Sequence, residues 1–101
     1  MESEHIGAYQ FDPAKEAWLV RERRLSFDLV IKAMESGKFK VIPNPSPKYK
    51  HQYIILFLHN DYVHVAPMVP STENNMDRFF LKTIFPASKY QGYYYHELKE
   101  L

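Results

Sequence analysis

The period of the hydrophobic pattern changes at Gly37, and this change constrains the fold more than any other feature of the sequence. Before it, Phe27, Val30, Ile31 and Met34 recur at the spacing of one helix face, and Gly37 itself can end that helix in the left-handed conformation. After it, short runs rich in β-branched and aromatic residues alternate with Pro, Asn and Asp, which is typical of strands and turns. Helices followed by strands predict an α+β domain, with the helices packed on an antiparallel sheet.

Two helices are expected at the start of the chain. Asp12 is a good N-cap, and Pro13 is favoured at the first helical position because its missing N–H would have no partner there. The first helix then runs to Arg23, with Trp18 as the expected anchor of its buried face. Ser26 is the expected N-cap of the second helix.

Four strands are predicted in the rest of the chain, which gives the order ααββββ and an antiparallel meander. The two middle strands flank an Asn-Asp turn and should form a hairpin. Residues 70–77 are polar and are expected to be a loop, and a short tail helix could begin at Ser88, with Gly92 interrupting it. The expected strands cover Phe39–Ile42, Gln52–Leu58, Tyr62–Ala66 and Arg78–Phe85, the last one stopped by Pro86.

A length of 101 residues suits a single domain, with a flexible N-terminus at 1–10, a core at 11–86 and a C-terminal tail at 87–101. The sequence has no cysteine, which excludes disulfides and thiolate zinc sites. It contains neither a Gly-rich phosphate loop nor an HExxH motif, so no cofactor or metal is expected. Without a membrane-length apolar run or an apolar leader, the expected location is the cytoplasm.

Positive charge is concentrated in the middle of a chain whose formal net charge is only +1. No acidic residue lies between Glu35 and Asp61, whereas four lysines do. This stretch could be the electrostatic footprint of a polyanion, or simply a solvated loop that carries lysines. Aromatic residues make up 16% of the chain, and some are candidates for base stacking, namely Tyr49, Tyr53 and Tyr93–Tyr95.

One chemistry needs few parts and fits the residues that are present, namely metal-free RNA cleavage by the 2′-hydroxyl of the RNA itself. The protein must accept one proton, stabilise the charged phosphorane and donate another proton. Lys82 lies among apolar neighbours and should point out of the core, although it could be only an exposed lysine. His64 alternates with Val63 and Val65, and could likewise be only a surface residue. The candidates on predicted strands or at their ends are Lys50, His51, Tyr53, His64, Lys82 and Lys89.

The segment FDPAK at residues 11–15, followed by Ser26–Phe27, resembles the W/F-D-x-x-K and x-S-F motifs with which BrnT-type toxins begin. The order of the later elements is also similar, so the resemblance covers about residues 9–90. Aligned on Ser26–Phe27, the segment Glu22–Arg24 stands where the family usually has K-H-G. Ser88 and Lys89 are the best match to the family's Ser-Ala-Arg-type end.

The resemblance implies a RelE-like fold, with two helices followed by a curved antiparallel sheet, and the toxin half of a type II toxin–antitoxin pair. It implies a metal-independent endoribonuclease that inhibits translation, neutralised by a small DNA-binding antitoxin encoded beside it. On this hypothesis Lys82 stabilises the phosphorane and His64 or His51 moves the proton. The residues expected to bind RNA are Arg23, Lys50, Ser88 and Lys89 at phosphates and Tyr53 at a base.

The alternative hypothesis is a non-catalytic protein-interaction or RNA-binding module with the same fold. Its support is the tyrosine-rich tail, because aromatic residues favour the cores of interfaces. The tail could dock on its own domain, on a second copy in a homodimer, or on the antitoxin in a hetero-oligomer. The tail residues concerned are Tyr90, Tyr93, Tyr94, Tyr95, Leu98 and Leu101.

Overall fold

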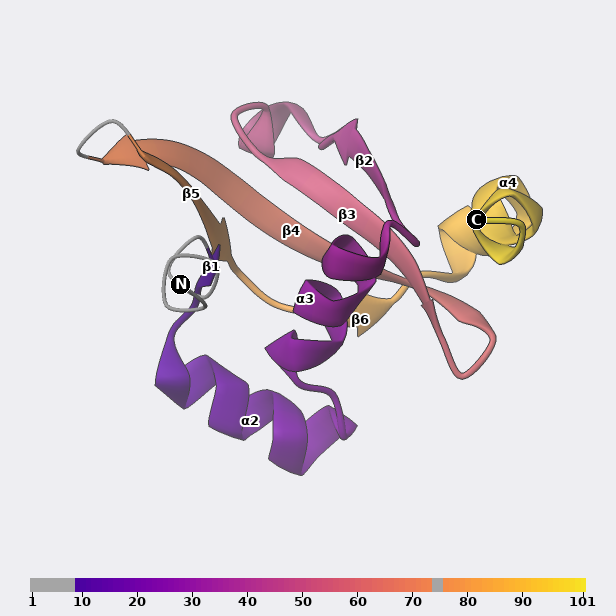
Figure 1. Cartoon of the computed structure of the whole chain (residues 1–101), viewed down its shortest axis with the longest axis horizontal. Helices are drawn as coiled ribbons and strands as arrows, with labels where there is room; N and C mark the ends of the chain where they lie inside the picture. Colours follow the sequence, from indigo (N-terminus) through magenta and orange to yellow (C-terminus); the bar gives the residue numbers. More distant parts are fainter. Residues whose placement is uncertain (1–8, 74–75) are drawn as a thin grey trace.

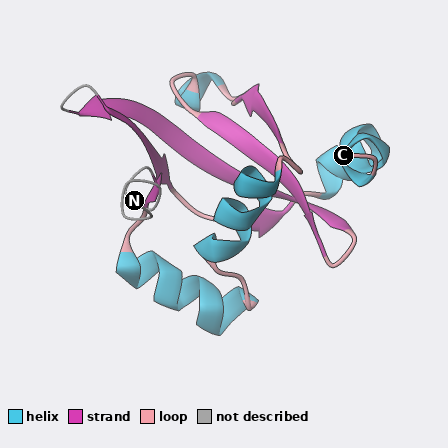
Figure 2. Cartoon of the chain, in the orientation of Figure 1, coloured by secondary structure: helices cyan, strands magenta, loops and turns pink. Residues whose placement is uncertain are grey.

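The computed structural model describes residues 9–73 and 76–101, and within them a six-stranded sheet is flanked by three helices (Figures 1 and 2). The helices are α2 (Pro13–Arg23), α3 (Phe27–Ser36) and α4 (Ser88–Lys99), with a 3-10 turn η1 (Pro47–Tyr49). The strands are β1 (Tyr9–Gln10), β2 (Lys40–Pro43), β3 (Tyr53–His59), β4 (Tyr62–Glu73), β5 (Met76–Leu81) and β6 (Phe85–Pro86).

The sheet has the order β1-β5-β4-β3-β2, and the four strands β2 to β5 form the predicted antiparallel meander. The mixed α+β class and the two N-terminal helices are therefore confirmed. The prediction of four strands is wrong, because β1 adds a parallel pair with β5 and β6 pairs with β4. Both additional strands have only two residues, and pairing with a long neighbour is what orders them.

Three local expectations fail along the strands. Residues 1–10 were expected to be flexible, but Tyr9 and Gln10 pair with β5, and residues 1–8 lie outside the described part of the chain. Residues 70–77 were expected to be a loop, but β4 and β5 extend into them as a long arm (Figure 1). The strand expected at 78–85 is broken, so that Lys82 follows the end of β5 and Pro86 lies inside β6.

Helix α2 begins as predicted, but it buries a different residue. The Asp12 carboxylate accepts a hydrogen bond from the Ala14 N–H at 2.9 Å. Leu19 is fully buried, whereas Trp18 is half-buried, with the Lys15 ammonium and the Arg23 guanidinium each 4.8 Å from its ring. The tryptophan therefore packs under two cations at the edge of the core, and the prediction that it anchors the buried face is wrong.

Helix α3 begins at the predicted place by a different contact. The Ser26 side chain makes no capping hydrogen bond, and the Glu16 carboxylate of α2 accepts the Phe27 N–H at 2.8 Å instead. Gly37 ends the helix with φ of 77°, as predicted. Arg24, with φ of 57°, turns the chain sharply between α2 and α3.

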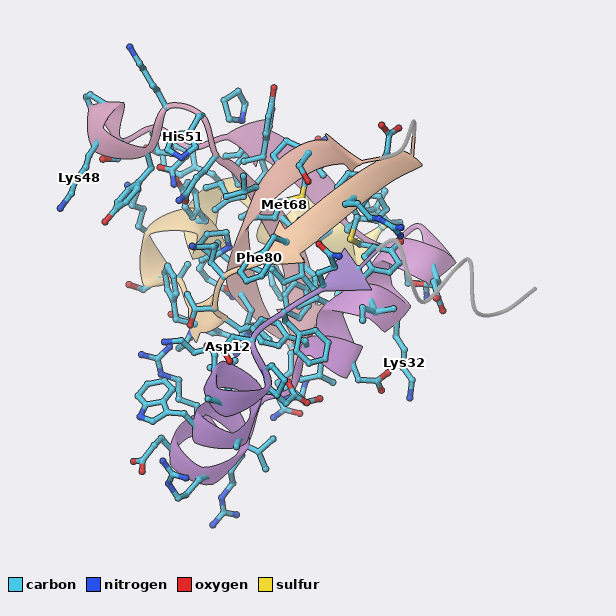
Figure 3. All side chains as sticks on the ribbon, turned by 90° about the vertical axis from the view of Figure 1, so that its left-hand side faces the viewer. Asp12, Lys32, Lys48, His51, Met68 and Phe80 are labelled. Carbon is cyan, nitrogen blue, oxygen red and sulfur yellow. The ribbon has the colours of Figure 1, made fainter. Side chains whose placement is uncertain are left out.

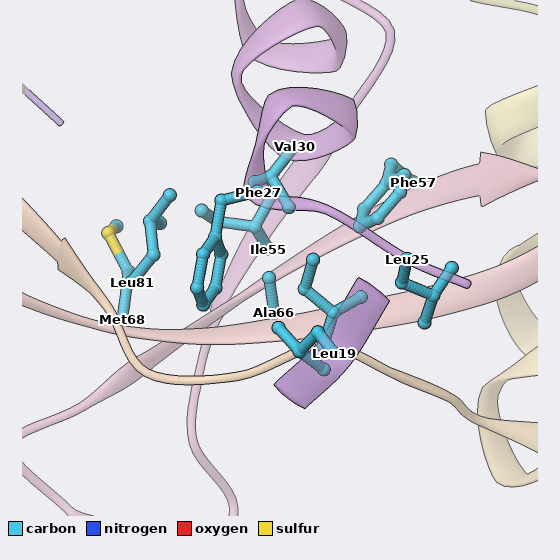
Figure 4. Packing of buried hydrophobic residues seen from close by; sticks show 10 residues of the cluster. Leu19, Leu25, Phe27, Val30, Ile55, Phe57, Ala66, Met68 and Leu81 are labelled. Atoms are coloured by element: carbon cyan, nitrogen blue, oxygen red, sulfur yellow. The ribbon is translucent and has the colours of Figure 1, made fainter. Parts of the chain in front are cut away.

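The two faces of the sheet carry two separate apolar clusters, because neighbouring strand residues point to opposite faces. Helices α2 and α3 cover the larger cluster, and Figure 4 shows how closely its side chains pack. Helix α4 covers the smaller one. The larger cluster includes Leu19, Phe27, Val30, Ile55, Phe57, Ala66, Met68, Leu81 and Ile84, and the smaller one is Ile54, Leu56, Val63, Val65, Ala87 and Leu98.

Helix α4 is longer than the interrupted tail helix that was expected, and it continues through Gly92. Tyr90, Tyr94 and Tyr95 pack on the smaller cluster, so the tail docks on its own domain, whereas Tyr93 is 80% exposed. At its end, the Asp61 carboxylate accepts hydrogen bonds from the Tyr95 hydroxyl at 2.9 Å and the Lys99 ammonium at 2.7 Å. None of the described helices is long and apolar enough to span a membrane.

Candidate functional site

Two histidines and two arginines meet beside the tip of the β3–β4 hairpin. The hairpin turns through Asn60 and Asp61, both with positive φ, and this turn places His59 diagonally across from His64. The two imidazole rings lie 5.3 Å apart, edge to face. Both histidines line a hollow of about 450 Å³, called here the His–Arg hollow. Its lining residues are Arg23, Arg24, Leu25, His59, Asn60, His64 and Pro86.

His64 is buried, with 7% of its surface exposed. Its Nδ1 lies 3.0 Å from the Tyr62 carbonyl oxygen. A carbonyl can only accept, so Nδ1 carries the proton and Nε2 keeps a free lone pair. Burial lowers the pKa of His64 below its ordinary value of 6.5, the nearby His59 lowers it further, and the Tyr62 carbonyl opposes these effects only in part. His64 is therefore a neutral imidazole near pH 7 and can accept a proton.

The two arginines that line the hollow come from the end of α2 and the turn after it. The Arg23 Nη1 donates a hydrogen bond to the Ile84 carbonyl at 2.7 Å, which ties the end of α2 to the segment before β6. Arg24 is exposed, and no ion pair engages its guanidinium within the described part of the chain. A guanidinium offers five N–H donors, so both side chains retain donors for an anion such as a phosphodiester.

A second feature lies on the face of the sheet that carries α4. Two adjoining hollows of about 420 Å³ each share Asn44, Ser46, Pro67 and Phe85. They form one depression, called here the lysine groove. Lys82 and Tyr49 line one part of it, and Ser88, Lys89 and Tyr90 line the other.

The lysine groove is positively charged and carries no acidic side chain among its described lining residues. Lys82 and Lys89 belong to its two parts. The Lys82 Nζ lies 5.3 Å from the Phe80 ring, and the Lys89 Nζ lies 5.2 Å from the Tyr90 ring. Such a surface combines positive charge with aromatic faces.

The residues predicted for the site fall into three groups. His64 and Arg23 meet in the His–Arg hollow, whereas Lys82, Ser88 and Lys89 meet in the lysine groove. The structure does not bring Lys82 and His64 together, because His64 faces the α2–α3 side, like Ala66 and Met68. The third group, which lines neither feature, is Lys50 and His51 on the exposed turn after η1 and Tyr53 at the start of β3.

The structure adds residues to the site that sequence reasoning did not select. His59 could have been found, because its position directly before the Asn60–Asp61 turn is a local signal. Tyr49 was named as a candidate for base stacking but was not among the predicted site residues. Arg24 was noted only as the last residue of the segment aligned with K-H-G. Nothing in the sequence singled out Phe85, because its place in the groove depends on the pairing of β6 with β4.

No group of three or more described His, Cys, Asp or Glu side chains is arranged to hold a metal ion. No protein-family model matches the chain, and no curated protein sequence matches it. The function is therefore inferred from the residues of the His–Arg hollow and the lysine groove.

Proposed function

We propose that the chain is a metal-independent endoribonuclease and the toxin member of a toxin–antitoxin pair. The observation that carries this proposal is the buried, neutral His64, whose Nε2 has a free lone pair, in a hollow with His59 and two arginines. The resemblance of residues 11–27 to the start of BrnT-type toxins adds support. In that alignment the glycine of K-H-G falls on Arg24, which has the positive φ that favours glycine.

The proposed reaction divides the chemistry among these residues. His64 Nε2 takes the proton of an RNA 2′-hydroxyl, whose oxygen then forms a bond to the adjacent phosphorus. The bond from phosphorus to the 5′-oxygen breaks, and His59 is the general acid that gives a proton to that leaving oxygen. Arg23 and Arg24 hold the negative charge of the phosphorane. The products are a 2′,3′-cyclic phosphate and a 5′-hydroxyl, and exchange with water returns both imidazoles to their starting states.

Removing the base should have the largest effect on cleavage. His64→Gln keeps a polar side chain of similar size, and we expect it to slow cleavage by about 10²- to 10⁴-fold, since that is the usual contribution of a general base. The measurement is cleavage of a single-stranded RNA in a chelator, with analysis of the product ends. His96→Gln, an exposed histidine on α4, is the matched control and should cleave like the wild type.

Arg24→Gly is a second variant that keeps the test independent of folding, because glycine adopts the positive φ of this turn without strain. We expect it to remain folded and to cleave about 10²-fold more slowly. Folded wild type that leaves RNA intact, or two variants that cleave like the wild type, would contradict the proposal. Controlled expression in a bacterial host tests the toxin part, since growth arrest should need His64 and should be relieved by an adjacent antitoxin gene.

A further inference from the structure

We propose that the lysine groove binds the single-stranded segment of RNA next to the cleaved phosphodiester, so that one strand crosses β6 from the groove to the His–Arg hollow. The place of cleavage rests on the proposed function. The binding of a single strand in the groove rests on the groove's own residues.

The charge of the groove favours a polyanion. Lys82 and Lys89 line its two parts, and no acidic side chain is among the described residues that line it. Lys82 is also held in place through its backbone, because its N–H donates to the Pro67 carbonyl at 2.9 Å. Two ammonium groups in one depression can neutralise two phosphates of the same strand.

The rings of the groove favour nucleotides over an acidic peptide. Tyr49 and Phe85 keep 40% and 37% of their surface exposed, although both line the depression. Bases stack on such exposed aromatic faces regardless of their identity. A single strand of RNA alternates flat bases with phosphates, which matches an arrangement of rings and lysines. An acidic peptide would use the lysines but leave the rings without a partner.

Continuity across β6 connects binding to cleavage. Pro86 lines both the groove and the His–Arg hollow, and β6 pairs with β4 at His64 and Val65. Neighbouring strand residues point to opposite faces, so Val65 faces the groove and His64 faces the hollow. A strand that leaves the groove over Pro86 therefore arrives at the imidazoles and arginines.

The test uses the intact protein and a short fluorescent 2′-O-methyl oligoribonucleotide, which lacks the hydroxyl that cleavage needs. Binding is followed by anisotropy at several salt concentrations. Lys82→Ala combined with Lys89→Ala should weaken binding and make the slope of log K against log salt less steep by about 1.4, the loss of two phosphate contacts. Lys32→Ala combined with Lys38→Ala removes the same charge elsewhere and should leave the slope unchanged. Figure 3 shows Lys32 of α3 far from Lys48, which belongs to η1, the turn that also carries Tyr49 of the groove.

Substitutions of Tyr49 separate the contribution of base stacking from that of charge. Tyr49→Ala should weaken binding by about 5- to 100-fold, which corresponds to the loss of one stacked base, and Tyr49→Phe should restore it. Groove variants that bind like the control pair would overturn the inference, as would polyglutamate that binds as tightly and with the same dependence on Lys82 and Tyr49. If the groove variants weaken binding as expected but the wild type does not cleave ordinary RNA, the groove is supported and the nuclease proposal is contradicted. If the groove variants cleave RNA like the wild type, the nuclease proposal is supported and the groove inference is contradicted.

Discussion

The two faces of the sheet differ in how completely they are covered. Helices α2 and α3 close one face over the larger apolar cluster, and at its margin they leave a buried imidazole beside two arginines. On the other face α4 covers the smaller cluster, and a groove with exposed rings and lysines lies beside it. Burial adjusts the acid–base properties of a group, whereas exposure keeps charges and rings free for a ligand. One sheet can thus separate reaction from binding.

The difference in cover follows from the helices themselves. Helix α3 is strongly amphipathic and buries Phe27 and Val30, and α2 adds Leu19. Helix α4 fully buries only Leu98 of its twelve residues. It is held further by half-buried tyrosines and by polar contacts, such as the Gln91 side-chain oxygen, which accepts the Val63 N–H at 2.8 Å. Polar contacts at the surface stabilise less than burial does.

The largest expected effects on stability compare the two clusters directly. Phe27→Ala should lower the free energy of unfolding by about 3 to 5 kcal/mol, because it empties a fully buried site. Leu98→Ala should lower it by about 2 to 3 kcal/mol, since its cluster lies nearer the surface and can partly collapse. Urea unfolding of the two variants measures both values. A Leu98 variant that is the less stable of the two would show that α4, and not α3, closes the main core.

A smaller expected effect is the pH dependence of the free energy of unfolding that His64 of the His–Arg hollow contributes. His64 has a pKa below 6.5 in the folded state, so the unfolded chain binds more protons below that value. Its contribution to stability is therefore complete above about pH 6.5 and is lost as the pH falls toward the pKa of the folded state.

His64→Gln should flatten this dependence in thermal melts between about pH 7 and pH 5. The groups that face His64 are His59, Tyr62, Arg23 and Arg24. The variant His59→Gln, melted over the same range, separates the contribution of the second imidazole from that of His64. Equal pH dependence in the wild type and His64→Gln would show that His64 is not shielded from water.

Local signals predicted the parts of the fold that depend on nearby residues. The helical spacing from Phe27 to Met34 and the Asn60–Asp61 turn each specify structure within a few residues, and both were predicted correctly. Strand β1 could not be predicted, because Tyr9 and Gln10 become a strand only by pairing with β5.

The full length of β4 could not be predicted, because the strand contains two prolines, Pro67 and Pro70. Pro67 lies at the gap between β5 and β6, where only the Lys82 N–H reaches its carbonyl. Pro70 lies beyond the start of β3, which pairs with β4 only as far as Met68. At both places the sheet needs no N–H from β4, so proline is tolerated within the strand.

The candidate site depended on register, which the sequence does not specify. Lys82 was expected to point out of the core and His64 to face away from Val63 and Val65, and the catalytic hypothesis placed both in one site. Pairing of Met68 with Leu81 puts Phe80 on the face opposite His64, and the chain leaves the ladder at Lys82. A shift by one residue would reverse this placement.

We propose that one RNA strand uses both sides of β6. An NMR titration of the labelled protein with the 2′-O-methyl oligoribonucleotide, following backbone amide shifts, tests this directly. We expect Tyr49, Lys82 and Ser88 in the groove to shift together with Arg24 and His64 in the hollow, at the same oligonucleotide concentrations. Shifts confined to one side of β6, or located only around α3, would contradict it.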